Sequence, residues 1–309
     1  MSAASSPSPG AQSSNADGSP PDGVRGLPGA RAIDDARSGD IARAGGDARV
    51  ADETSTASAV AAAIEAEGYA IARGVVAPAR IAAMRAIAER HRSRRLPPFE
   101  LEAELNYPGA PQLDGRGAGT IRRLLQAHGR GDLFTEWIAD PFLTAVLSAR
   151  YGWPLVCPLA HHNCLMTKQP EFSSETGWHQ DVRYWSFTRP DLCSVWLPLG
   201  REREVNVALR VVPGSHRDDF AADQFDAARF FRADWPANAA WLDRAITVQL
   251  DVGDVLFFHA RTLHAAGRNR TSEAKLAAVF TFHALDNPPL PGTRSSSLPE
   301  LLIHEPAHH

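Results

Sequence analysis

The chain has 309 residues, of which 44% are hydrophobic, and its 32 basic and 36 acidic residues give a formal net charge of −4. This length fits one large domain or two small ones, and a slight negative charge is not that of a protein that binds nucleic acid. No stretch approaches the roughly 18 apolar residues that a membrane-spanning helix requires. The N-terminus also lacks the basic and apolar regions of a signal peptide, so no membrane partner is expected.

The cysteines give a prediction about compartment and metal. There are three, Cys157, Cys164 and Cys193, and they form no CxxC motif. An odd number without that motif argues against a disulfide framework and against a thiolate zinc site. Reduced thiols are typical of the cytosol, which predicts a cytoplasmic protein.

Residues 1–53 differ in composition from the rest of the chain. They are rich in Ser, Ala, Gly, Pro and Asp and contain no Phe, Tyr, Trp or Cys. Such a segment cannot bury enough apolar surface to offset the entropy lost on ordering. We therefore predict a disordered extension over 1–53 and one folded domain over 54–309.

The first part of the domain reads as two helices with a strand between them. The run from Ala59 to Ile64 favours a helix, which Gly68 would end. Residues 69–76 read as a short strand. A second helix is predicted over residues 77–92, where apolar side chains recur every three residues.

A loop and a third helix are predicted next. Pro97 and Pro98 interrupt the pattern, and residues 94–119 read as a long loop, which in a compact domain is often functional. Residues 133–151 read as a helix that is interrupted or restarted at Asp140 and Pro141.

After Gly152 the pattern changes to strands. Ile246, Val248 and Leu250 alternate with polar residues, the period of two that marks a strand. Short runs of Val, Leu, Phe and Trp lie near 155–168, 192–199, 206–212, 246–250, 255–259 and 275–283. Many short strands with turns between them favour a β-sandwich or barrel, with the N-terminal helices on its outside. The predicted class is therefore mainly β with N-terminal helices (α+β).

One group of residues indicates metal chemistry. His179 and Asp181 are two positions apart, which on a strand would place both side chains on one face, and His264 follows on a later strand. Two imidazoles and one carboxylate on one face of an octahedron suit non-haem Fe(II) and leave three positions open. An HxD pair also arises by chance in a chain with 12 histidines, so the spacing alone is a weak signal.

Further motifs around these residues resemble the phytanoyl-CoA dioxygenase family of Fe(II)- and 2-oxoglutarate-dependent oxygenases. The resemblance runs from about Gly68 to about Ala284. The matching segments, in order, are Gly68-Tyr69, Lys168, Trp178-His179-Gln180-Asp181, Tyr184-Trp185, residues 209–216 (LRVVPGSH), residues 253–259 (GDVLFFH) and Leu263-His264. The family fold is a double-stranded β-helix, a cupin-like jelly roll, which agrees with the strand pattern.

The resemblance implies a set of ligands and pocket residues. It assigns His179, Asp181 and His264 to iron, and it places Trp196 and Cys164 at positions that line the co-substrate pocket. A core role for Trp196 and Cys164 is the alternative.

Two departures from the family concern the co-substrate. The family usually has Ser or Thr two residues after the distal histidine, where this chain has Ala266, and Arg eleven residues after it, where this chain has Lys275. That Arg binds the distal carboxylate of 2-oxoglutarate. A lysine can bind a carboxylate as a point charge but cannot form the bidentate fork of arginine.

The implied reaction uses Fe(II), 2-oxoglutarate and O2 to hydroxylate a small molecule, with release of succinate and CO2. Substrate contacts are expected from Arg183, Tyr184 and Trp185, and from the 94–123 segment with Arg122 and Arg123. Desaturation or ring formation would need the same ligands. The alternatives are a non-catalytic binding module on the same scaffold and a metal enzyme that works without 2-oxoglutarate.

Overall fold

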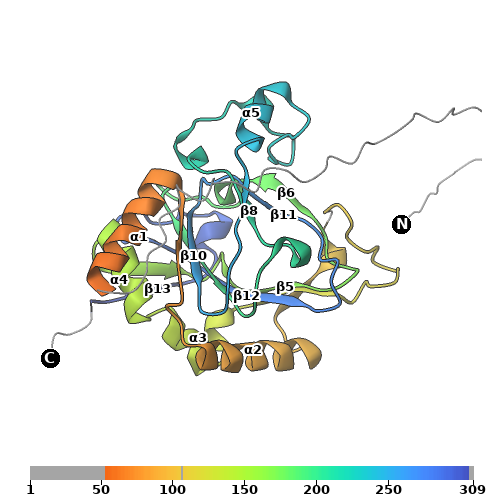
Figure 1. Cartoon of the computed structure of the whole chain (residues 1–309), viewed down its shortest axis with the longest axis horizontal. Helices are drawn as coiled ribbons and strands as arrows, with labels where there is room; N and C mark the ends of the chain where they lie inside the picture. The colour runs from red at the N-terminus through yellow and green to blue at the C-terminus, as the bar shows by residue number, and fades with distance from the viewer. Residues whose placement is uncertain (1–52, 106, 306–309) are drawn as a thin grey trace, which may run out of the picture. The chain divides into compact units, whose positions relative to one another are not determined.

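The computed structural model describes residues 53–105 and 107–305 of the chain (Figure 1). The extension predicted over residues 1–53 lies outside this range, apart from Glu53, which begins the first helix. No helix within the described ranges is long and apolar enough to cross a membrane.

Four α-helices lie between residues 53 and 151 of the described part of the chain, and they confirm the predicted pattern. They are α1 (Glu53–Glu67), α2 (Pro78–Ser93), α3 (Asp132–Trp137) and α4 (Pro141–Tyr151), with a short α5 (Ala239–Leu242) much later. The predicted restart at Asp140 is a helix cap. The Asp140 carboxylate accepts a hydrogen bond from the Phe142 amide at 3.1 Å, and Pro141 is the first residue of α4.

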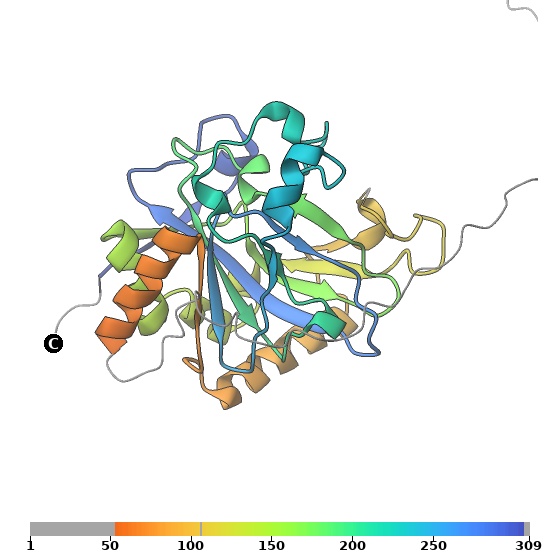
Figure 2. The ribbon, with the colours of Figure 1, turned by 45° about the horizontal axis from the view of Figure 1, so that its top comes forward.

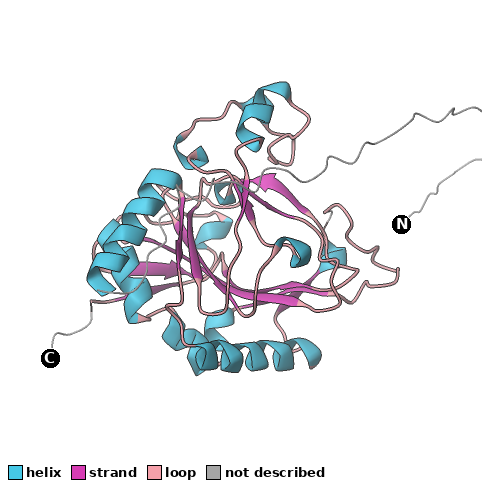
Figure 3. Cartoon of the chain, viewed as in Figure 1, coloured by secondary structure: helices cyan, strands magenta, loops and turns pink. Residues whose placement is uncertain are grey.

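In the described part of the chain the strands form two antiparallel sheets, drawn in magenta in Figure 3. The large sheet has nine strands. Seven of them follow the order β1 (Tyr69–Ala72), β10 (Val255–His259), β7 (Cys193–Pro198), β12 (Lys275–Ala284), β5 (Asn163–Lys168), β3 (Ile121–Leu125), β2 (Phe99–Leu101). The other two are β4 (Leu155–Pro158), which pairs with β12, and β13 (Glu300–Ile303), which pairs with β4. The small sheet has four, in the order β6 (Thr176–His179), β11 (His264–Ala266), β8 (Arg210–Val211), β9 (Ile246–Thr247).

The large sheet separates two apolar cores, and strand β12 shows how. Leu276, Phe280 and Phe282 point to one face and pack with helices α1–α4, of which α2 runs along the sheet in Figures 1 and 2. Ala277 and Val279, on the other face, pack with the small sheet. Two sheets that enclose a core, with helices on the outer face of one, confirm the predicted jelly roll with external helices.

Some local predictions need correction. The 94–119 segment is not all loop, because it contains β2 and a 3-10 turn at Glu102–Glu104. The strand expected near 206–212 is reduced to the two residues of β8. Strand β3 was not predicted, since the two arginines in its middle hide its apolar pattern.

Gly68 links helix α1 to strand β1 and is expected to be needed for stability. Its φ is +79°, and a Cβ would lie 2.5 Å from Nδ1 of His216 and 2.6 Å from Oγ1 of Thr262. Gly74 is the matched control, since its φ is +64° but nothing lies within 4 Å of an added Cβ. Gly68→Ala should lower the free energy of unfolding by roughly 2–4 kcal/mol, as a left-handed conformation and overpacking both contribute. Gly74→Ala should cost only about 1–2 kcal/mol. Denaturant unfolding measures both, and equal losses would contradict this account.

Candidate metal centre

The small sheet and the turn that follows strand β6 bring His179, Asp181 and His264 together. Strands β6 and β11 pair with His179 directly opposite His264. The Nε2 atoms of the two histidines lie 3.8 and 3.7 Å from Oδ1 of Asp181, and all three side chains are buried. Their ligand atoms all lie within 4.8 Å of one another. No other group of three or more His, Cys, Asp and Glu side chains in the described part of the chain meets this limit.

The predicted position of Asp181 on a strand is wrong. The sequence predicts that one strand carries both His179 and Asp181. Strand β6 instead ends at His179, and Asp181 is the first residue of a 3-10 turn over Asp181–Arg183. The turn, together with the side-by-side strands, aims the carboxylate at the imidazoles.

Backbone hydrogen bonds fix the orientation of both imidazoles. Nδ1 of His179 lies 2.9 Å from the carbonyl oxygen of Gly177, and Nδ1 of His264 lies 2.9 Å from that of Thr262. A carbonyl only accepts, so each Nδ1 must donate its hydrogen there. Each Nε2 therefore carries a lone pair that points toward Asp181. Histidines that bind a metal through Nε2 require this arrangement.

The electrostatics also fit a divalent cation. Burial, and then the neighbouring His264, lower the pKa of His179 well below its usual value, so its imidazole is neutral. The Asp181 carboxylate is 1% exposed. Its Oδ2 accepts a hydrogen bond from the Ser194 hydroxyl at 3.3 Å, and Nδ1 of His162 lies 3.6 Å away. Two imidazoles and one buried carboxylate form the donor set that suits Fe(II).

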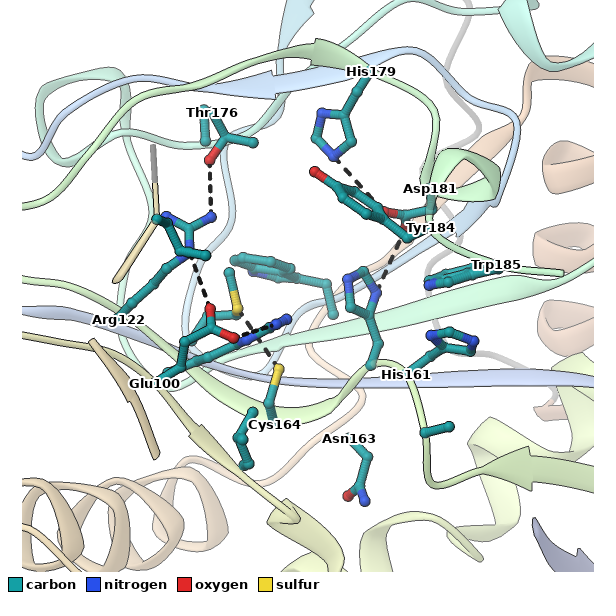
Figure 4. Close-up of a pocket in the computed structure, with 18 of the residues that line it drawn as sticks. Glu100, Arg122, His161, Asn163, Cys164, Thr176, His179, Asp181, Tyr184 and Trp185 are labelled. Carbon is teal, nitrogen blue, oxygen red and sulfur yellow. Dashed lines mark hydrogen bonds and ion pairs between the residues drawn. The ribbon is translucent and has the colours of Figure 1, made fainter. Parts of the chain in front are cut away.

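The three groups open into a cavity of about 430 Å³ (Figure 4). Of the predicted site residues, it is lined by Cys164, Trp196, Lys275, Tyr184, Trp185, Arg122 and Arg123 as well as by the triad. Its other charged lining residues are Glu100, Lys168 and Arg294. The cavity therefore reaches from the metal ligands to a group of charged side chains that no single motif reveals.

Arg183 is placed differently from the prediction, since it does not line the cavity. Its guanidinium lies 3.6 Å from the ring centroid of Phe230 and 4.5 Å from that of Tyr184, and it donates a hydrogen bond to the Ala228 carbonyl. Arg183 therefore holds the 228–230 segment against Tyr184. A direct contact with substrate is not supported by this position.

Tyr184 and Trp185 form part of the cavity wall beside the metal ligands, as Figure 4 shows. The hydroxyls of Tyr184 and Tyr107 lie 2.6 Å apart, and burial raises the pKa of Tyr184, so its phenol stays protonated. The ring of Trp185 lies 5.3 Å from that of His161 and 5.1 Å from that of His162.

A β-bulge places two consecutive arginines in the cavity. Glu100 pairs with Arg123, but Leu101 pairs with Ile121, so Arg122 is the extra residue of strand β3. In a regular strand Arg122 and Arg123 would point to opposite faces, whereas here both line the cavity. Nη2 of Arg123 donates to Glu100 at 2.7 Å, and Nη1 of Arg122 donates to Glu102 at 3.3 Å.

The amine of Lys275 is buried and already bonded. It donates to Oε2 of Glu202 at 3.1 Å and to the carbonyl of Val207 at 2.7 Å, and it lies 5.1 Å from the ring centroid of Trp196. The indole of Trp196 donates to the other Glu202 oxygen at 2.9 Å. Sequence reasoning missed Glu202, because it lies in an alternating run of Arg and Glu that is typical of a solvated turn.

A comparison of the sequence with known families supports this reading of the site. The family model described as phytanoyl-CoA dioxygenase (PhyH) matches residues 64–277, well over half of the chain. The chain belongs to the phytanoyl-CoA dioxygenase family. Membership confirms the resemblance drawn from the motifs around His179 and His264.

The curated proteins that this chain resembles are distant in sequence. It is 27% identical over 163 residues to a probable phytanoyl-CoA dioxygenase of Caenorhabditis elegans, a match that covers 49% of this chain and 51% of that protein. It is 28% identical over 138 residues to a probable alpha-ketoglutarate-dependent hypophosphite dioxygenase of Stutzerimonas stutzeri, which covers 42% of this chain and 47% of that protein. The chain thus spans about half the length of these relatives.

Solved structures share the fold at low identity. The epimerase SnoN, in complex with Fe3+, alpha ketoglutarate and nogalamycin RO, matches with a TM-score of 0.60 and 21% identity over 82% of this chain and 96% of that one. EctD from S. alaskensis, with 2-oxoglutarate and 5-hydroxyectoine, matches with a TM-score of 0.59 and 20% identity over 74% of this chain and 77% of that one.

Proposed function

We propose that this protein is an Fe(II)- and 2-oxoglutarate-dependent dioxygenase that hydroxylates a small molecule. In the net reaction, 2-oxoglutarate, O2 and a substrate C–H group give succinate, CO2 and an alcohol. Family membership supports the class of reaction, and the names of the relatives support the co-substrate.

The observation that carries this proposal is the geometry of the triad. His179 and His264 face each other across two paired strands, each with Nδ1 bonded to a carbonyl, and Asp181 meets both Nε2 atoms. These residues would hold iron through three positions and leave the others open. Bound iron would supply the redox chemistry that joins O2, the 2-oxo acid and the substrate.

The chain's own residues orient the metal ligands. The carbonyls of Gly177 and Thr262 hold the imidazole tautomers, and Ser194 holds the carboxylate of Asp181. The retained carboxylate occupies the position that a halide would need, so hydroxylation is favoured over halogenation. Substrate would lie against Tyr184 and Trp185, on the cavity wall beside the ligands.

A coupled assay tests the proposal. Fe(II)-loaded protein is supplied with 2-oxoglutarate and O2 and screened against small polar metabolites, and succinate is measured with and without each candidate. We expect succinate that requires both iron and O2 and that rises with the true substrate. If the iron-loaded protein makes no succinate with any substrate, and also fails to bind 2-oxoglutarate, the proposed function is wrong.

A second candidate is a metal-binding module on the same scaffold, either non-catalytic or independent of 2-oxoglutarate. One observation favours it: Glu202 puts a buried carboxylate against Lys275, where the family's arginine would receive the co-substrate. In that case the protein would bind Fe(II) without releasing succinate, which separates the two candidates.

A further inference from the structure

Lys168 is a buried lysine that lines the cavity beside Lys275. It is the last residue of strand β5 and pairs with Lys275 in the strand register. The residue is only 5% exposed. Its Nζ donates to the carbonyl of Ser174 at 2.5 Å and to that of Gly267 at 3.1 Å. An ammonium has three donors, so one remains for a further acceptor.

Lys168 differs from its charged neighbours because it has no acidic partner. Within the described part of the chain, no carboxylate lies within ion-pair distance of Lys168, whereas Lys275 has Glu202 at 3.1 Å and Arg122 has Glu102 at 3.3 Å. Burial, followed by the charge of Arg122, lowers the pKa of Lys168 to about 7. A buried ammonium without an ion-pair partner is costly, so a ligand carboxylate beside Nζ would stabilise the charged form of Lys168.

Lys275 has an acidic partner, although it stands where the family has its arginine. Its charge is balanced by Glu202, which is itself fully buried and held by the indole of Trp196. A ligand carboxylate that approached Lys275 would also approach Glu202 and be repelled by it. The same carboxylate beside Lys168 would meet an unbalanced positive charge.

The amine of Lys168 also contacts the end of the strand that carries His264. Its partner Gly267 comes directly after strand β11, three residues beyond His264. Cys164 and Met166, on the same face of β5 as Lys168, line the same cavity. A diacid bound to the metal through one end could therefore reach toward Lys168 along this wall.

We propose that Lys168 binds the distal carboxylate of the 2-oxo diacid, while Lys275 is neutralised by Glu202. This inference rests on the proposed function and names the residue that selects the co-substrate. It predicts that a 2-oxo acid with a second carboxylate is preferred over one of equal length without it, and that the preference depends on Lys168.

The experiment compares two ligands with two variants of the full-length protein. The ligands are 2-oxoglutarate and 2-oxopentanoate, which has the same five-carbon 2-oxo acid chain without the second carboxylate. Dissociation constants are measured on Fe(II)-loaded protein without oxygen and without substrate. Lys168→Met should weaken 2-oxoglutarate binding roughly ten- to a hundred-fold, because a hydrogen bond between charged groups is lost. Binding of 2-oxopentanoate should be unchanged.

The matched control removes the neighbouring ion pair while keeping its net charge of zero. Lys275→Met combined with Glu202→Gln should bind 2-oxoglutarate almost as well as the wild type. Melting temperature and iron content of each variant show that it is folded and loaded. The proposal is overturned if Lys168→Met leaves 2-oxoglutarate binding unchanged or weakens the binding of both ligands equally. It is also overturned if Lys168→Met weakens 2-oxoglutarate binding no more than the double variant does. A substrate carboxylate as the true partner of Lys168 would give the first of these results.

Failure of the proposed function would look different. Iron-loaded wild-type protein would then bind neither 2-oxoglutarate nor 2-oxopentanoate, and both the function and the role of Lys168 would fall. Wild-type protein that binds 2-oxoglutarate, with no selective effect of Lys168→Met, would remove only the role of Lys168.

Discussion

Replacing His179 or His264 by alanine is expected to abolish iron binding. Each imidazole is one of three ligands, and each is held by a single backbone carbonyl with its Nε2 toward Asp181. Loss of an outer partner of a metal ligand already weakens binding about ten- to a hundred-fold, so loss of a ligand itself should exceed that. Iron per chain, measured after loading and desalting, should fall from one in the wild type to near zero in each variant.

His304→Ala is the control for this experiment. His304 is exposed and stands after the last strand, so its loss should leave the iron content at the wild-type value. Melting temperatures of all three variants separate loss of metal from loss of fold. Undiminished iron in both His179→Ala and His264→Ala would show that the triad is not the metal site.

Asp181→Gly is expected to eliminate hydroxylation while leaving two histidines for the metal. The substitution removes the buried carboxylate and opens a coordination position, at which weak halide binding could be detected. Succinate formation that depends on substrate should drop by more than a hundred-fold, since loss of a ligand exceeds the effect of an outer partner.

Ser194→Ala gives a graded comparison for Asp181→Gly. It removes only the hydroxyl that donates to Oδ2 of Asp181 at 3.3 Å. Its activity should fall by at most about ten- to a hundred-fold, clearly less than that of Asp181→Gly. Full activity in Asp181→Gly would mean that this carboxylate does not bind the metal.

The regular elements of the fold could be predicted because their patterns are local. Helix α2 follows apolar side chains every three to four residues, and strand β10 coincides with the predicted segment 255–259. The switch from helical to strand patterns after Gly152 was enough to predict a mainly β core with helices on its outside. The metal ligands were found because the motifs around them resemble a known family.

The charged part of the site could not be predicted in the same way. Glu202 looks like a solvated residue in a run of alternating charges. In the folded chain its backbone pairs with Leu250, and its carboxylate is buried beside Lys275. Arg122 enters the cavity because of a bulge whose register depends on the partner strand β2. The sequence places Lys168 in a family motif, but its lack of an ion-pair partner is a property of the folded structure.

An anaerobic titration of the iron-loaded protein tests the central claim most directly. A 2-oxo acid that chelates Fe(II) through its carboxylate and oxo group produces a visible charge-transfer absorption, which neither component shows alone. We predict that 2-oxoglutarate develops this band in the wild type and saturates at one per chain, and that the band is absent in His179→Ala. Iron-loaded wild-type protein that shows no such band at any 2-oxoglutarate concentration would contradict the account.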